Sequence, residues 1–203
     1  MFASLLGLAS ALSWGTGDFV GGVASRKVGT YRAVLYGEAI GLLFLFAALP
    51  FVHEPFPDNH TLKWSIAAGV VGNFALLAFF EAMRQGRISV AAPLSALIGS
   101  IIPVIVGSFM DGLPQPIILF AFGLALIAVV LISREKDEGD PTGKNRYLLF
   151  PILAGIGFGL YFVLIHEASQ EWVFGPLIAA RTSGTISTAL FLLFKQKSFR
   201  VKS

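Results

Sequence analysis

Long, continuous apolar runs are the feature that most limits how this chain can fold. A helix needs about 20 mostly apolar residues to cross a bilayer. On that measure we expect membrane-spanning helices at residues 2–24, 31–52, 64–83, 88–110, 114–133, 147–166 and 173–194. The runs do not alternate apolar with polar residues, which excludes a transmembrane β-barrel. The sequence therefore predicts an all-α, polytopic membrane protein with about seven transmembrane helices.

The composition excludes several other classes of protein. Charged residues make up 13% of the chain, whereas a soluble domain has about 25%. The absence of cysteine excludes a disulfide framework and a thiolate metal site. The net charge of +3 is confined to short connections, which argues against nucleic acid as a partner. No basic segment precedes the first apolar run, so we expect a retained helix rather than a cleaved signal peptide.

Lysine and arginine follow an alternating pattern along the connections. The first, third and fifth connections and the C-terminal tail are basic, whereas the second has only Lys63 and the fourth and sixth have none. By the positive-inside rule the basic connections are cytoplasmic and the N-terminus is outside. The strict alternation supports seven spans. We expect a multi-pass protein that lies in the lipid bilayer of the plasma or inner membrane.

A polar connection at residues 134–146 divides the predicted helices. It mixes acidic and basic residues with glycine and proline, a composition typical of linkers. We therefore predict a first repeat at 1–133, the polar loop at 134–146, the start of a second repeat at 147–194 and a basic cytoplasmic tail at 195–203. The stretches "ALSWGTGDFVGGVAS" and "AGIGFGLYFVLIHEAS" align at a shift of 144 residues, which lays Trp14 on Phe158. Internal repeats of this kind are common in carriers.

Three charged residues fall deep within the predicted helices: Asp18, Glu38 and Arg181. A charge at the centre of a bilayer costs roughly 2.5–3.5 kcal/mol on insertion scales, so such residues face a cavity or a partner. Asp18 shares a helix face with Trp14 and with the glycines that follow. It is a candidate for binding a cation or a coupling proton. The alternatives are an acid hydrogen-bonded to a neighbouring helix, or one that stays wet near Arg26.

Glu38 and Arg181 each allow a functional and a structural interpretation. Glu38 lies between Gly37 and Gly41, a spacing that also suits close helix packing. Arg181 keeps its proton, so it can hold an anionic substrate or pair with Asp18 or Glu38.

Three uncharged residues complete the candidate site. Asn73 lies mid-helix and can contact a ligand or join two helices by hydrogen bonds. Trp14 and Tyr161 occupy corresponding stretches of the two halves. Aromatic side chains there can bind a cationic or aromatic substrate, or they can serve only to pack the helices. The predicted substrate- or ion-binding residues are Trp14, Asp18, Glu38, Asn73, Tyr161 and Arg181.

The usual motifs of hydrolases, zinc peptidases and phosphate loops are absent, so we expect no enzyme activity and no cofactor.

The order of several motifs resembles a known family. The segments "LSWGTGDFVGGVASRK", "FFEAMRQGRISVAAPLSAL", "IIPVIVGSFMDGL", "FGLALIAVVLISR", "AGIGFGLYFVL" and "LIAARTSG" are together similar to the EamA-type family of the drug/metabolite transporter superfamily. The resemblance implies two inverted repeats of five helices, of which this chain carries one complete repeat and the start of the second. It also places Arg181 where that family often has an arginine. The family's usual orientation, with the N-terminus inside, is opposite to the one that the charges indicate.

These observations lead to two functional hypotheses. The first is a secondary transporter that moves a small metabolite or drug-like compound by alternating access, with proton coupling through Asp18 as a further step. The second is a truncated, non-transporting remnant, or a membrane protein that assembles with further copies of itself. The resemblance to a ten-helix family raises this second hypothesis, because seven helices leave one repeat open.

Overall fold

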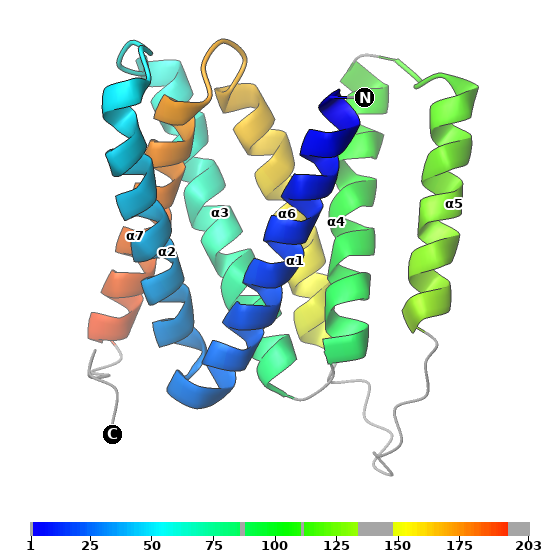
Figure 1. The fold of residues 1–203 in the computed structure, drawn as a ribbon, viewed down its shortest axis with the longest axis horizontal. Helices are drawn as coiled ribbons and strands as arrows, with labels where there is room; N and C mark the ends of the chain where they lie inside the picture. The colour runs from blue at the N-terminus through cyan, green and yellow to red at the C-terminus, as the bar shows by residue number, and fades with distance from the viewer. Residues whose placement is uncertain (1, 86–87, 111, 134–147, 195–203) are drawn as a thin grey trace.

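The computed structural model describes residues 2–85, 88–110, 112–133 and 148–194, and this part of the chain is helical with no strand. The helices run alternately up and down, so that the first helix begins and the last helix ends at opposite ends of the bundle (Figure 1). The all-α, polytopic fold that the sequence predicts is therefore confirmed. The α-helices are α1 (Phe2–Val28), α2 (Thr30–Ala48), α3 (Asn59–Arg84), α4 (Ile88–Met110), α5 (Pro116–Ser133), α6 (Leu149–Ala168) and α7 (Phe174–Phe194), and the short 3-10 helix η1 (Leu49–Phe51) follows α2.

Five of these helices are long and apolar enough to cross a membrane: α2 with η1, α3, α4, α6 and α7. In α5 the apolar stretch Pro116–Ala128 is shorter. Helix α1 is long, but its Gly, Ser and Thr residues and Asp18 lower its mean hydropathy. That α1 and α5 also span the bilayer stays a prediction.

The end of α1 and the start of α3 differ from the boundaries expected from apolar length. Helix α1 continues to Val28, where Gly29 with a φ of 88° reverses the chain into α2. Helix α3 begins at Asn59 because Asp58 caps its N-terminus, with Oδ1 accepting a hydrogen bond from the Thr61 amide at 2.8 Å. Turns and caps are set by single polar or glycine residues, which an apolar window does not detect.

Helix α3 lies at the centre of the bundle and packs against α6, α7, α1 and α2. Phe79, Phe80 and Met83 on α3 are buried in the core, together with Val34 of α2 and Ala154 of α6. The most buried surface of the molecule thus joins the first predicted half to the second.

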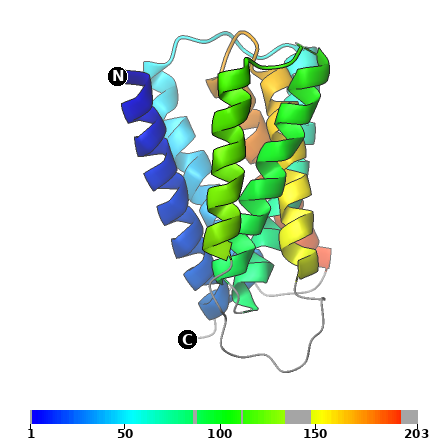
Figure 2. The same cartoon turned by 90° about the vertical axis from the view of Figure 1, so that its right-hand side faces the viewer.

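Helix α6 fits between α3 and α4 because glycine lines both of its contact faces. A Cβ on Gly155 or on Gly159 would lie 2.6 Å from the Cβ of Ile98 or of Ile102 on α4. A Cβ on Gly157 would lie 2.7 Å from the Cβ of Ala75 on α3. The glycines four residues apart form the small-residue spacing that brings membrane helices close together. Helix α5, in contrast, packs on α4 at the edge of the bundle (Figure 1) and is the helix nearest the viewer in Figure 2.

The corner between α1 and α2 lies against the end of α3. Arg26 donates hydrogen bonds to the Met83 carbonyl from Nε at 3.2 Å and from Nη2 at 3.0 Å. The Thr30 hydroxyl donates to Glu81 at 2.7 Å. The basic residues of the first connection therefore lie at the same end as the last turn of α3, as the alternating charge pattern requires. The side of the membrane that this end faces stays a prediction, and the predicted linker and tail lie outside the described residues.

Candidate functional site: a cavity between the two predicted halves

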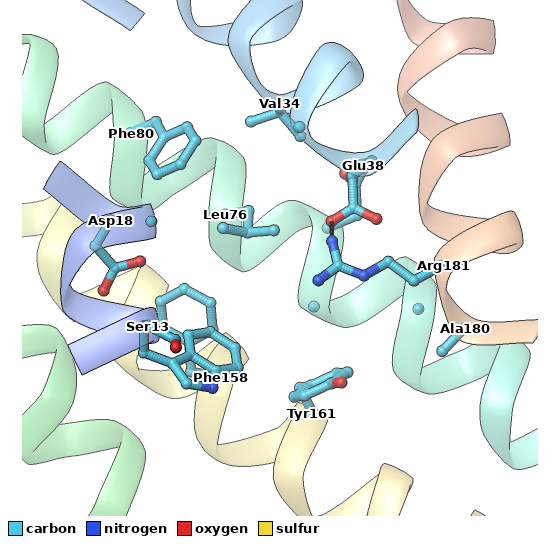
Figure 3. A pocket seen from close by; sticks show the side chains of 16 residues that line it. Ser13, Asp18, Val34, Glu38, Leu76, Phe80, Phe158, Tyr161, Ala180 and Arg181 are labelled. Atoms are coloured by element: carbon cyan, nitrogen blue, oxygen red, sulfur yellow. Dashed lines mark hydrogen bonds and ion pairs between the residues drawn. The ribbon is translucent and has the colours of Figure 1, made fainter. Parts of the chain in front are cut away.

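A cavity of about 370 Å³ lies between α1, α2, α3, α6 and α7. Its polar residues come from the middle of their helices. Figure 3 shows Asp18, Glu38, Tyr161 and Arg181 around one space. It thus combines helices of the predicted first repeat with both helices of the second. The structure brings all six residues of the predicted site to this cavity: Trp14, Asp18, Glu38, Asn73, Tyr161 and Arg181. That they bind a substrate or an ion stays a prediction.

An ion pair between Glu38 and Arg181 joins α2 to α7. The Arg181 Nη1 atom lies 3.0 Å from Glu38 Oε1. The side chain of Glu38 is 7% exposed and that of Arg181 is 39% exposed, so the pair lies at the cavity wall with the carboxylate turned inward. Of the partners that the sequence allowed for Arg181, the structure selects Glu38.

Each member of the ion pair lies over a glycine of the opposite helix. A Cβ on Gly41 of α2 would be 3.3 Å from the guanidinium carbon of Arg181. A Cβ on Gly184 of α7 would be 3.4 Å from Glu38 Oε2. Each helix therefore carries a charge and, three residues later, a glycine that makes room for the opposite charge. The sequence analysis did not identify Gly184, although the same 143-residue spacing relates both charges and both glycines.

Asn73 connects α3 to α7 at the same wall. Its Nδ2 atom donates a hydrogen bond to Ser187 Oγ at 2.9 Å, and its Oδ1 atom accepts one from Thr188 Oγ1 at 2.8 Å. Asn73 and Thr188 are buried. The amide group thus joins two helices, as one of the two interpretations proposed, while the residue also lines the cavity.

Asp18 is different, because it has no hydrogen-bond or ion-pair partner among the described residues. It lies half-buried on α1. Figure 3 shows its carboxylate on one side of the cavity and the Glu38–Arg181 pair on the other, with Leu76 between them. The interpretation of Asp18 as an acid bonded to a neighbouring helix finds no support in this part of the chain.

Aromatic side chains form much of the remaining wall. Trp14 comes from α1, Phe80 from α3, and Phe158 and Tyr161 from α6. The ring of Tyr161 lies over Gly72, where a Cβ would be 2.7 Å from Cδ2. Sequence reasoning missed two of these rings as site residues. The alignment of Trp14 with Phe158 could have identified Phe158, whereas Phe80 is hidden in an apolar run.

This arrangement is suited to holding a small organic molecule. Ligand pockets are typically about 300–1,000 Å³ and mostly apolar, with a few polar groups that orient the ligand. Here the charged groups are the Glu38 and Asp18 carboxylates and the Arg181 guanidinium. Within the described ranges, no group of three or more His, Cys, Asp or Glu residues could hold a metal ion.

At the end opposite the α1–α2 corner, a loop ties the two predicted halves together. Glu54 accepts hydrogen bonds from the amide groups of Phe174 at 2.8 Å and Gly175 at 3.1 Å, and so caps the first turn of α7. Beside it, His60 of α3 lies 3.9 Å from Glu167 of α6. Residues distant in the sequence thus close this end of the bundle.

Comparison with known proteins identifies one family. The sequence profile described as the EamA-like transporter family matches residues 1–134, which include α1 to α5. No curated protein and no solved structure matches the chain. Because the family match covers more than half of the sequence, the chain belongs to the EamA-like transporter family, and it is a membrane transporter of the drug/metabolite type.

Proposed function

We propose that this protein is a secondary transporter that moves a small metabolite or drug-like compound across the plasma or inner membrane by alternating access. The observation that carries the proposal is the shared cavity. Charged and aromatic residues from five helices converge there, near the middle of the bundle and between the two predicted halves. Many carriers bind their substrates at such an interface between repeats, close to the middle of the membrane.

The contacts between helices bear on how the two predicted halves would move against each other. The second-half helices pack mainly on α3, α4 and α2, whereas α1 packs on α2 and α3. A rocking motion of one half against the other would open the cavity first to one side and then to the other. The Glu38–Arg181 pair and the Glu54 cap both cross between the halves, so both contacts would have to persist or exchange during this motion.

Proton coupling through Asp18 is a second step of the proposal. A carboxylate with no partner in a partly dry cavity is less stable in its charged form, so it can take up a proton and release it when the cavity fills with water. In proteoliposomes with an imposed pH gradient, we expect Asp18→Asn to abolish the dependence of uptake on the gradient. Unchanged pH-dependent uptake in that variant would exclude this role.

Uptake into proteoliposomes tests the proposal as a whole. A panel of radiolabelled amines, amino acids, carboxylic acids and neutral aromatic compounds should include at least one whose uptake exceeds that of empty liposomes and saturates. Uptake that does not saturate would indicate a channel, and the absence of uptake across the panel would contradict transport.

Two matched tryptophan variants link any uptake to the cavity. Gly17 lines the cavity and Gly7 does not, and neither has another atom within 4 Å of an added Cβ. Gly17→Trp should fill the cavity and abolish uptake, whereas Gly7→Trp should leave uptake unchanged. Equal effects of the two variants would show that the cavity is not the route.

A further inference from the structure

We propose that the cavity selects organic cations with a single positive charge and an aromatic body, and that Asp18 is the counter-ion for the cationic group. This inference rests on the proposed function and names its substrate class. It follows from the balance of charge, the packing of the ion pair and the aromatic lining.

Two carboxylates but only one cationic side chain line the cavity. Glu38 and Arg181 neutralise each other at 3.0 Å. Asp18, on the opposite side, adds a carboxylate that has no partner in the part of the chain described by the structure. The lining therefore carries one uncompensated negative charge when its groups are ionised. A ligand with one positive charge compensates it, whereas an anion would add to it.

The positive charge of Arg181 is already compensated within the cavity wall. Its Nη1 atom is bonded to the Glu38 carboxylate at 3.0 Å, and a Cβ added to Gly41 would lie 3.3 Å from its guanidinium carbon. A carboxylate ligand at Arg181 would either displace Glu38, whose side chain is 7% exposed, or add a second negative charge beside it. Leaving a buried carboxylate without its partner is strongly unfavourable. An anion or a zwitterion therefore meets a penalty at this wall that a cation does not.

The surroundings of Asp18 suit a cation attached to a ring. Trp14 lies one turn before Asp18 on α1, and this residue is 51% exposed and lines the cavity. Gly17, between the two, has no atom within 4 Å of an added Cβ, which leaves space for substituents on the cationic nitrogen. Phe80 and Phe158 add further aromatic surface. Aromatic faces attract cations, most strongly where water is excluded.

Equilibrium binding to the protein in nanodiscs tests the inference. Four compounds with the same phenyl body differ in charge: phenethylamine is a cation, phenylalanine a zwitterion, 3-phenylpropionate an anion and phenethyl alcohol neutral. Isothermal titration calorimetry should give the highest affinity for phenethylamine, by roughly tenfold or more over the anion and the zwitterion, as expected for one charge-assisted contact. Equal or tighter binding of the anion or the zwitterion would overturn the inference, as would no binding of phenethylamine.

Two asparagine variants assign the selectivity to Asp18. Asp18→Asn should weaken phenethylamine binding by about 10- to 100-fold and leave phenethyl alcohol binding unchanged, which also shows that the variant is folded. Asp58→Asn makes the same chemical change outside the cavity and should change neither affinity. Unaltered phenethylamine binding in Asp18→Asn would overturn the inference.

The outcomes separate this inference from the proposed function. Charge-selective binding without uptake into proteoliposomes would contradict transport alone. Saturable uptake together with binding that ignores charge, or favours anions, would contradict the cation selectivity alone.

Discussion

The two sides of the cavity use similar residues in opposite ways. On what we call the α7 side, formed by Glu38, Asn73 and Arg181, every charged or amide group has a partner on another helix. On the α1 side, formed by Trp14, Gly17 and Asp18, the carboxylate has none among the described residues.

The space around glycine residues also differs between the two sides of the cavity. On the α7 side, a Cβ on Gly69 of α3 would overlap the backbone oxygen of Ala180. On the α1 side, a Cβ on Gly17 would meet no atom within 4 Å. A polar residue inside a membrane protein can hold helices together or remain available to a ligand. We propose the first role for the α7 side and the second for the α1 side, and the predictions below on cavity residues test that division.

The largest effect is expected from breaking the ion pair. Arg181→Met leaves the Glu38 carboxylate buried without its counter-ion, and we expect a loss of about 3 kcal/mol in the free energy of unfolding, near the lower end for buried pairs because Arg181 is partly exposed. Unfolding by SDS in mixed dodecylmaltoside micelles measures this loss. Converting the partner as well, in Glu38→Gln with Arg181→Met, should restore much of the stability. Glu38→Gln alone completes the comparison. If the loss of unfolding free energy in the double variant equals the sum of the losses in the two single variants, the pair does not couple the helices.

The next effect compares glycine on the two sides. Gly69→Ala forces a methyl group against the α7 backbone and should cost about 1–3 kcal/mol, as for overpacked cores. Gly17→Ala, on the open α1 side, should leave the free energy of unfolding unchanged or slightly raise it, since alanine favours helix. Similar values for the two variants would show that the two sides are packed alike.

A smaller loss is expected at the amide bridge on the α7 side. Asn73→Ala removes both hydrogen bonds to Ser187 and Thr188, and should cost about 1 kcal/mol, since hydrogen bonds between membrane helices are individually modest. Asp18→Asn should cost less in the same SDS titration, because no hydrogen bond or ion pair with the described residues is lost. A greater loss from Asp18→Asn than from Asn73→Ala would reverse the assignment of structural and binding roles.

The smallest effect concerns Asp58, a carboxylate outside the cavity that serves as a reference for both sides. Hydrogen bonds from Thr61 hold the pKa of Asp58 below its ordinary value. Because the folded pKa is the lower one, its contribution to stability is complete above the unfolded pKa of about 4 and is lost as the pH falls through the folded value.

Unfolding curves between about pH 6 and pH 3 measure this contribution. Asp58→Asn keeps a residue that caps helices and should remove this part of the pH dependence. The difference in unfolding free energy between Asp58→Asn and the unsubstituted protein should vary with pH over this range. If it does not, ionisation of the Asp58 carboxylate does not contribute to stability.

Much of the fold and of the candidate site was predictable because the membrane imposes strong rules. Apolar length identified the helices, and the cost of buried polar groups directed attention to Asp18, Glu38 and Arg181, which all line the cavity. The pairing of these charges was not predictable. Arg181 could have joined either acid, and the choice depends on Gly41 and Gly184, which allow α2 and α7 to approach.

Packing between distant helices was the other gap in the sequence analysis. The insertion of α6 between α3 and α4 depends on Gly155 and Gly159 meeting isoleucines more than fifty residues away. Phe80 lies in an apolar run where no local pattern separates a cavity residue from a core residue. Contacts of this kind depend on three-dimensional register, which periodicity and composition do not specify.

The most direct test of the account is whether the cavity is reached from both sides of the membrane. The chain contains no cysteine, so Gly37→Cys places a single thiol in the cavity, at a position where an added Cβ meets no atom within 4 Å. Its reaction with a membrane-impermeant maleimide is measured in right-side-out and inside-out vesicles, with Gly7→Cys, which lies outside the cavity, as the control. Alternating access predicts that Gly37→Cys reacts in both kinds of vesicle and more rapidly than the control. Reaction from one side only, or from neither side, would contradict the claim that this cavity is the transport site.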